Sequence, residues 1–236
     1  MSNSYFSFKK FTVQQAHCAM KVCTDSCIFG AWAGPEKSQD KIKVLDIGTG
    51  TGLLSLMLAQ RYENVFIDAI EIDEPAAMQA TENFTSSPWA NRLHAIHSDI
   101  EEFPVVNKYD FIISNPPFFH NNLKSPAPRI NTARHVHSMD EEVLIKIIDK
   151  HLSVSGSFAL MISFERREKC LQAAEKSGCF PAKELWVKQT PEHDYFRAMI
   201  QFEKTRANAV IQKMCIKEKD NIYSKAYYAL MNDYLR

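Results

Sequence analysis

The stretch Lys41-Ile42-Lys43-Val44-Leu45-Asp46-Ile47-Gly48-Thr49-Gly50-Thr51-Gly52 predicts the opening of an α/β fold. Its first seven residues form a short apolar run that is too brief for a helix, and a turn with three glycines follows at once. Residues 53–60 then carry leucine and methionine at helical spacing. A strand, a glycine turn and a helix in this order can bind a nucleotide-like cofactor, although a glycine-rich turn alone is a weak signal.

A second predicted strand strengthens this interpretation of the glycine turn. Residues 65–70 are apolar except for Asp68 and are followed by Glu71, roughly twenty residues after the turn, where a carboxylate would meet a ribose. The spacing Gly-x-Gly-x-Gly also differs from the Gly-x-Gly-x-x-Gly of dinucleotide dehydrogenases, in which a pyrophosphate rests on the helix N-terminus. We therefore expect a cofactor that contains a nucleoside, and hydride transfer is disfavoured.

The rest of the chain continues to alternate strands and helices. Further strands are predicted at residues 93–97, 109–114, 156–162 and 184–187, and helices at residues 74–84 and 165–177. A capping box formed by Ser138 and Glu141 opens another helix, with Val143, Leu144, Ile147, Ile148 and Leu152 on one face.

The end of the chain predicts a change in strand direction. Residues 196–202 follow the strand at 184–187 without room for a helical crossover, so these two strands must be antiparallel. An additional strand at residues 209–216 and a helix at 223–235 complete the chain. The pattern predicts a doubly wound, Rossmann-like α/β fold with seven mainly parallel strands and an antiparallel strand pair at the C-terminal end.

Length and composition are those of one globular domain. The chain has 236 residues, of which 45% are hydrophobic and 24% are charged, so a single core is sufficient. We expect an N-terminal cap at residues 1–40 with a short helix at 28–33, a core at 41–204, and a C-terminal strand and helix at 205–236. No apolar run has the length of a membrane helix, and the start lacks a signal-peptide pattern, which predicts a cytoplasmic protein without membrane contact. Nothing in the sequence determines the oligomeric state, and a monomer is the expectation.

The six cysteines do not follow the spacing of a disulfide framework or a zinc knuckle. His17 lies close to Cys18, Cys23 and Cys27, but no second ligand pair follows at zinc spacing. The spacing Cys-x4-Cys-x3-Cys also differs from the Cys-x3-Cys-x2-Cys of radical enzymes. We therefore expect reduced thiols that are buried as small hydrophobic side chains, and no metal site.

Polar side chains follow four successive predicted strands. Asp46, Glu71, Asp99 and Asn115 all lie at or directly after the carboxyl end of a strand. In a doubly wound sheet these ends share one edge, and ligands bind outside it. The four side chains therefore predict a ligand site at this edge.

The fourth of these side chains belongs to the motif Asn115-Pro116-Pro117-Phe118-Phe119. Two consecutive prolines fix φ and supply no backbone N–H, so the preceding carbonyls stay available as acceptors. The side chain of Asn115 offers a further oxygen, and the ring of Phe118 offers a face for stacking. The motif suits a planar amino group, and the alternative is a proline-terminated strand end with core phenylalanines.

Charge is balanced over the whole chain, with 28 acidic and 28 basic residues, so no general field for polyanions is implied. Basic residues nevertheless gather in two places. Lys124, Arg129 and Arg134 lie in a segment without acids, and five cations between residues 204 and 219 accompany the single Glu218. Each cluster is either solvated surface or a contact to nucleic acid.

The order of these motifs resembles that of class I methyltransferases, which use S-adenosylmethionine. Residues 46–52 correspond to the cofactor loop, and Asn115–Phe118 is similar to the motif of the branch that methylates amino groups. Within this class the chain resembles, nearly end to end, the bacterial tRNA1(Val) adenine-37 N6-methyltransferase family. The resemblance is carried by Phe11-Thr12, Met20-Lys21-Val22-x-Thr24-Asp25, Gly30-Ala31-Trp32, Ser114 to Phe119, Thr132-Ala133-Arg134-His135 and Tyr223-Ser224-x-Ala226-Tyr227.

The resemblance implies transfer of a methyl group from S-adenosylmethionine to N6 of adenosine 37 in the anticodon loop of tRNA1(Val). It implies a catalytic set that comprises Asn115, Pro116, Pro117 and Phe118. It implies cofactor contacts from Thr24, Asp25, Asp46, Gly48, Gly50, Glu71 and Asp99. Contacts to RNA phosphates are implied for Lys124, Arg129 and Arg134, and the cations at 204–219 are a second candidate.

Three other functions compete with this hypothesis. A guanine N2-methyltransferase of rRNA would have a similar motif and an equally planar amine. A release-factor glutamine N5-methyltransferase usually carries a helical N-terminal domain, for which residues 1–45 leave no room. The third alternative is an RNA-binding module without activity, and the intact Gly48, Glu71, Asp99 and Asn115 argue against it.

Overall fold

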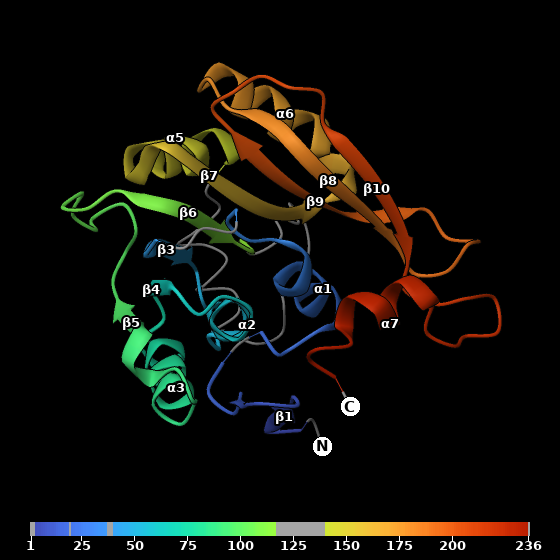
Figure 1. Ribbon diagram of the computed structural model, residues 1–236, viewed down its shortest axis with the longest axis horizontal. Coiled ribbons are helices and arrows are strands. Elements are labelled where there is room, and N and C mark those ends of the chain that lie inside the picture. The colour runs from blue at the N-terminus through green and yellow to red at the C-terminus, as the bar shows by residue number, and fades with distance from the viewer. Residues whose placement is uncertain (1–2, 19, 37–39, 117–139, 236) are drawn as a thin grey trace.

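A central sheet organises the residues that the computed structural model describes, which are 3–18, 20–36, 40–116 and 140–235. In these residues the sheet has eight strands, and helices lie on both of its faces (Figure 1). The strands are β3 (Ile42–Ile47), β4 (Val65–Glu71), β5 (Leu93–His97), β6 (Tyr109–Ser114), β7 (Leu152–Ser163), β8 (Phe180–Lys188), β9 (Tyr195–Glu203) and β10 (Val210–Cys215). Their order in the sheet is β10-β8-β9-β7-β6-β3-β4-β5.

Strand directions confirm the predicted fold class. β3 is parallel to β4 and to β6, β5 is parallel to β4, and β7 is parallel to β6. β9 is antiparallel to β8, as the short connection predicted, and it is also antiparallel to β7. β10 corresponds to the additional strand predicted at residues 209–216; it pairs parallel with β8, so the sheet has eight strands instead of the predicted seven.

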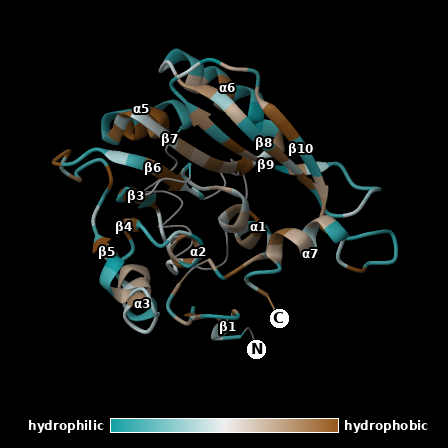
Figure 2. Ribbon diagram, in the orientation of Figure 1, coloured by the Kyte–Doolittle hydropathy of each residue, from teal (hydrophilic) through white to brown (hydrophobic). Residues whose placement is uncertain are grey.

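Two groups of helices cover the two faces of the sheet. The helices are α1 (Thr24–Trp32), α2 (Leu53–Arg61), α3 (Glu74–Thr85), α5 (Glu141–His151), α6 (Arg167–Lys176) and α7 (Lys225–Met231), with 3-10 turns η1 (Ala90–Arg92) and η2 (Phe164–Arg166). Val44 packs in a core cluster with residues of α1, α2, α3 and α7, whereas its neighbour Leu45 packs in a second cluster with residues of α5 and α6. Successive side chains of a strand point to opposite faces of the sheet, and here helices cover both faces. Consecutive residues of β3, such as Val44 and Leu45, are therefore both apolar, instead of alternating between apolar and polar. Figure 2 shows this hydrophobic character along β9 and a hydrophilic loop after β10.

The N-terminal region contains more regular structure than predicted. β1 (Tyr5–Ser7) and β2 (Thr12–Gln14) form an antiparallel hairpin in a stretch that was predicted to be irregular. The helix predicted at residues 28–33 begins at Thr24. Cys23, which precedes it, is exposed, whereas Cys18 and Cys27 are buried, so the prediction of three buried cysteines is wrong for Cys23.

Two further helix boundaries differ from the prediction. α5 begins at Glu141, with Asp140 at the N-cap position, so the predicted capping box does not set its start, and Ser138 lies outside the described residues. The buried carboxylate of Glu141 pairs with Arg166 instead of folding back on the helix end. Leu152, predicted on this helix, begins β7. The C-terminal helix, predicted at residues 223–235, spans Lys225–Met231, and the Ser224 hydroxyl caps its start by accepting a hydrogen bond from Tyr227 N at 3.1 Å.

Gly52 allows the glycine turn to pack against α3. Its φ is 81°, and a Cβ at this position would lie 2.4 Å from Cε1 of Phe84. We expect Gly52→Ala to lower the free energy of unfolding by about 2–4 kcal/mol, because a left-handed conformation and an overpacked contact both destabilise. Gly48→Ala is the matched control, since its φ is also positive but a Cβ there would meet no described atom within 4 Å. Urea unfolding should show a larger loss for Gly52→Ala, and equal losses would contradict the packing argument.

Candidate functional site

The glycine turn between β3 and α2 keeps its backbone accessible. Gly48 and Gly50 have positive φ values of 71° and 56°. The N–H groups of Gly48 and Thr49 both donate to the Ile70 carbonyl, at 2.9 and 3.0 Å, which fastens the turn to β4. A Cβ at Gly48 or Gly50 would meet no described atom within 4 Å. The two glycines therefore leave space in which a ligand could approach the backbone closely.

Asp46, the penultimate residue of β3, is a fully buried carboxyl group with one unused oxygen. Its Oδ2 accepts hydrogen bonds from the hydroxyls of Thr49 and Ser55, each at 2.7 Å. Its Oδ1 is buried and has no hydrogen-bond partner among the described residues. Burial, followed by the negative charge of Glu71, raises the pKa of Asp46 to about 6, although the two hydroxyls oppose this shift. A cationic ligand group would supply the missing partner of Oδ1.

The raised pKa of Asp46 predicts a pH-dependent affinity for a cationic ligand. The carboxyl group is protonated below about pH 6, and it must lose that proton before it can pair with a cation. The dissociation constant should therefore rise roughly tenfold between about pH 7 and about pH 5. Isothermal titration calorimetry with S-adenosylmethionine would measure this change. Asp46→Asn should bind weakly with little dependence on pH, and an unchanged pH dependence in this variant would assign the titration to another group.

Glu71, at the end of β4, joins the glycine turn to the following loop. Its Oε2 accepts the N–H of Gly50 at 2.8 Å, and its Oε1 accepts the N–H groups of Ile72 and Asp73, each at 3.0 Å. A carboxylate oxygen can accept two hydrogen bonds. Oε2 therefore keeps the capacity to accept one further donor, such as a ligand hydroxyl.

Strand register places the predicted polar residues at one edge of the sheet. Asp46 pairs with Ala69 in β4 and with Ile113 in β6, so Glu71 and Asn115 each lie two residues beyond a partner of Asp46. Asp99 lies two residues beyond His97, the residue that pairs with Glu71. Asp99 is half-buried, and its Oδ1 accepts the N–H of Glu101 at 2.9 Å. The predicted arrangement of the strand ends is therefore present.

Asn115, directly after β6, presents an amide with one unused acceptor. Its Nδ2 donates to Ser26 Oγ at 3.1 Å, whereas its Oδ1 is buried without a partner among the described residues. The hydroxyl of Ser114 donates to the Ile47 carbonyl at 2.8 Å and fixes the strand end that precedes the amide. Pro116 is half-buried. Pro117 and Phe118 lie outside the described residues, so their roles stay predictions.

Residues of α1 approach the Asn115 amide from the N-terminal region. Asp25 is buried, and its Oδ2 accepts a hydrogen bond from Arg197 Nε at 2.8 Å in an ion pair with β9. Thr24 begins α1 and is half-buried. Cofactor contacts of Thr24 and Asp25 stay predictions. The sequence interpretation missed Ser26 and Arg197. The antiparallel direction predicted for residues 196–202 was a usable signal, because it brings Arg197 to the edge of the sheet at which Asn115 lies.

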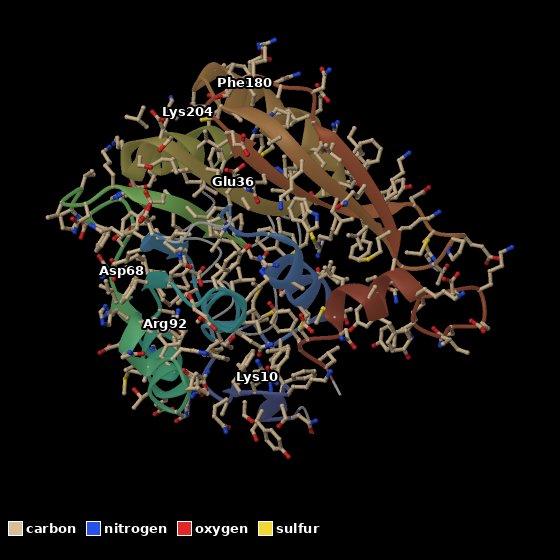
Figure 3. The ribbon with its side chains drawn as sticks, in the orientation of Figure 1. Lys10, Glu36, Asp68, Arg92, Phe180 and Lys204 are labelled. Atoms are coloured by element: carbon tan, nitrogen blue, oxygen red, sulfur yellow. The ribbon has the colours of Figure 1, made fainter. Side chains whose placement is uncertain are left out.

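The basic residues divide between the two edges of the sheet. Lys204 and Arg206 follow β9, which is antiparallel, so they lie at the edge opposite Asn115, where they pair with Asp149 and Glu175. In Figure 3 Lys204 lies with Phe180 at the top of the view, whereas α1 lies near the centre. Lys217 follows β10 at the same edge as Asn115. The three cations predicted to contact RNA, Lys124, Arg129 and Arg134, lie outside the described residues.

No helix in the described part of the chain has the length and apolar character that a membrane crossing requires. No group of three or more His, Cys, Asp or Glu side chains in residues 3–18, 20–36, 40–116 and 140–235 is arranged to hold a metal ion.

Known proteins are similar to this chain in sequence and in fold. Residues 35–163 match the family model for the methyltransferase small domain. A relative from Dyadobacter fermentans is 41% identical over 93% of this chain and 92% of its own length, and one from Parabacteroides distasonis is 40% identical over 99% and 98%. Both relatives are named tRNA1(Val) (adenine(37)-N6)-methyltransferase. The solved structure of a predicted O-methyltransferase from Agrobacterium tumefaciens has a TM-score of 0.67 over 88% of this chain and 95% of that chain, at 14% identity, and supports the fold alone.

Proposed function

Because this chain belongs to the tRNA1(Val) (adenine(37)-N6)-methyltransferase family, we propose that it methylates N6 of adenosine 37 in tRNA1(Val) with S-adenosylmethionine as the methyl donor. Within the site, the proposal rests on Asn115 Oδ1, which is buried and has no hydrogen-bond partner among the described residues. An acceptor in this state matches the N–H group of a substrate amine. The second unused oxygen, Asp46 Oδ1, matches the ammonium group of a methionine moiety.

The described residues fit S-adenosylmethionine. When bound, this cofactor supplies a methyl group on a positively charged sulfur, which a nitrogen lone pair can attack directly. Asp46 would hold the methionine ammonium, and Gly48 and Gly50 would admit the methionine portion beside the backbone. Glu71 would accept a ribose hydroxyl through Oε2, and Asp99 would accept a hydrogen bond from the adenine amine of the cofactor.

Asn115 addresses the chemical difficulty of the reaction. The lone pair of an exocyclic adenine amine is delocalised into the ring, which makes the nitrogen a poor nucleophile. If Asn115 Oδ1 and the backbone carbonyl of Asn115 each accept one amine hydrogen, the nitrogen can become pyramidal and direct its lone pair at the methyl group. In the transfer that this geometry would allow, the N–C bond would form as the C–S bond of the donor breaks, with the electron pair of that bond left on sulfur. The product cation is acidic enough to lose its proton to water, so no strong base is required.

The target base must leave its stack to reach Asn115. We propose that the base is extruded from the anticodon loop and stacks on Phe118, with Lys124, Arg129 and Arg134 near the phosphates. These residues follow Asn115 directly in sequence, which supports their assignment.

We further propose that the chain forms one domain, because residues of β2, α1 and α7 share a hydrophobic cluster with the core strands. We also propose that the protein is a monomer and that it acts in the cytoplasm, where its tRNA substrate is found.

Methylation of tRNA lacking the modification tests the proposal. The protein and labelled S-adenosylmethionine are incubated with total tRNA from cells without the activity, and with a tRNA1(Val) transcript in which guanosine replaces adenosine 37. We expect label at adenosine 37 of tRNA1(Val) and none in the altered transcript. Label in rRNA guanosine or in a protein glutamine would support the competing methyltransferase functions and overturn this one.

A further inference from the structure

A chain of polar contacts runs from β9 through the start of α1 to the Asn115 amide. Arg197 Nε donates to Asp25 Oδ2 at 2.8 Å. Asp25 Oδ1 accepts the N–H of Ser26 at 3.1 Å, and Ser26 Oγ lies 2.9 Å from Sγ of Cys23, the residue at the N-cap position of α1. Ser26 Oγ in turn accepts from Asn115 Nδ2 at 3.1 Å. Arg197, Cys23 and Ser26 are not among the predicted catalytic residues.

The ion pair at one end determines the direction of every hydrogen bond in the chain. A carboxylate only accepts hydrogen bonds, and the negative charge of Asp25 keeps Cys23 protonated and attracts its S–H. Once that proton is committed, Cys23 Sγ can interact with Ser26 only as an acceptor of the Ser26 O–H. The hydroxyl of Ser26 has then used its single proton, and its oxygen can only accept from Asn115. The group that faces Ser26 is therefore Nδ2, which leaves Oδ1 on the opposite side of the amide.

Cys23 acts in this chain as a thiol. Although the residue as a whole is exposed, desolvation of its sulfur, followed by the negative charge of Asp25, raises the pKa of Cys23 to about 11. The group therefore remains a protonated donor at neutral pH.

We infer that the Asp25–Arg197 ion pair, acting through Cys23 and Ser26, orients the Asn115 amide so that its oxygen faces the substrate amine. Cys23 and Ser26 are positioning residues, and the inference rests on the proposed function of Asn115. Orientation matters because rotation of the amide by a half-turn exchanges Oδ1 and Nδ2 with little change in shape. The rotated amide would present N–H donors to the N–H groups of the substrate and could not bind them. Oδ1 has no partner among the described residues, so the contact of Nδ2 with Ser26 supplies the preference.

Three variants separate this role from simple packing of α1. Ser26→Ala removes the acceptor of Nδ2. Cys23→Ala interrupts the chain, whereas Cys23→Ser keeps a group that can both donate and accept, so the two Cys23 variants form a matched pair. The exposed Ser7, in β1, provides an unrelated serine-to-alanine control.

The measurements are the single-turnover methylation rate at saturating cofactor, the dissociation constant of S-adenosylmethionine, and the side-chain amide signals of Asn115 in nitrogen-15 spectra. We expect Ser26→Ala and Cys23→Ala to slow methylation roughly threefold to tenfold, the range that one neutral hydrogen bond supports. Their cofactor affinity should match that of the wild type, and Cys23→Ser and Ser7→Ala should retain the wild-type rate. The Asn115 amide signals should shift in Ser26→Ala and not in Ser7→Ala.

Each alternative outcome has a defined meaning. Wild-type rates in Cys23→Ala, or unchanged Asn115 signals in Ser26→Ala, would overturn the inference. Equal slowing by Cys23→Ser and Cys23→Ala, or weaker cofactor binding in Ser26→Ala, would assign these residues to packing or to the cofactor and would also overturn it. If the wild-type protein fails to methylate adenosine 37, the proposed function fails, and the amide signals still decide whether Ser26 orients Asn115.

Discussion

Asn115→Ala is expected to reduce the rate of methyl transfer to tRNA by about 10²–10³-fold, the effect of removing one preorganised hydrogen-bonding group from a reaction centre. The loss should fall on the chemical step, because the variant lacks the buried Oδ1 that accepts from the substrate amine. The amide lies beyond β6 and has no contact with the glycine turn among its described hydrogen bonds. The dissociation constant of S-adenosylmethionine should therefore change by no more than about twofold. Single-turnover kinetics and calorimetry on the same preparations measure the two quantities.

An exposed asparagine provides the control for this prediction. Asn91, in η1, is exposed, and Asn91→Ala should retain the wild-type rate. If Asn115→Ala instead loses cofactor affinity in proportion to its rate, Asn115 belongs to the cofactor contacts and not to the amine acceptor. A rate within a few fold of wild type would refute its catalytic role.

Glu71→Ala is expected to weaken binding of S-adenosylmethionine by roughly 30–100-fold, because it removes a ligand contact and the acceptor for three backbone N–H groups. Those groups belong to Gly50, Ile72 and Asp73, so the loop that would receive the cofactor loses its attachment to the end of β4. Calorimetry gives the affinity, and urea unfolding of the same variant gives the stability.

Glu74→Ala is the matched control, because Glu74 is an exposed carboxylate in the first turn of α3. It should bind S-adenosylmethionine as tightly as the wild type. If Glu71→Ala keeps wild-type affinity while its stability falls, the role of Glu71 is confined to supporting the loop. Weak binding in both variants would indicate a general effect of negative charge near the site.

The strands of the core could be predicted because their physical causes are local. Two mainly apolar runs predicted strands: residues 42–47 end at the glycine turn, and residues 65–70 end at Glu71. The structure has β3 and β4 at these positions. Parallel topology then implied that Asp46, Glu71, Asp99 and Asn115 share an edge, and strand register shows that they do. Each of these inferences needed only neighbours in sequence and a general rule of sheet architecture.

The start of α1 could not be predicted because its causes lie far away in the chain. Residues 25–31 of this helix are all buried, so it lacks the polar face that reveals an amphipathic helix. Two of its buried residues are polar, and they are satisfied by partners that sequence periodicity does not reveal, since Asp25 pairs with Arg197 and Ser26 accepts from Asn115. The hairpin of β1 and β2 was missed for another reason, because each strand has only three residues, fewer than a periodic pattern requires.

The ion pair between α1 and β9 also has a consequence for the order in which this protein matures. Asp25 and Arg197 are 172 residues apart in the chain, and a ribosome adds residues from the N-terminus onward. β3, β4, β5 and β6 are therefore synthesised well before Arg197 can reach Asp25. Because a domain of this size generally folds as a unit, the ion pair, and with it the proposed orientation of the Asn115 amide, forms only after residue 197 has been synthesised. The C-terminal third of the chain therefore supplies the last contact of a site whose other polar residues all lie in the first half.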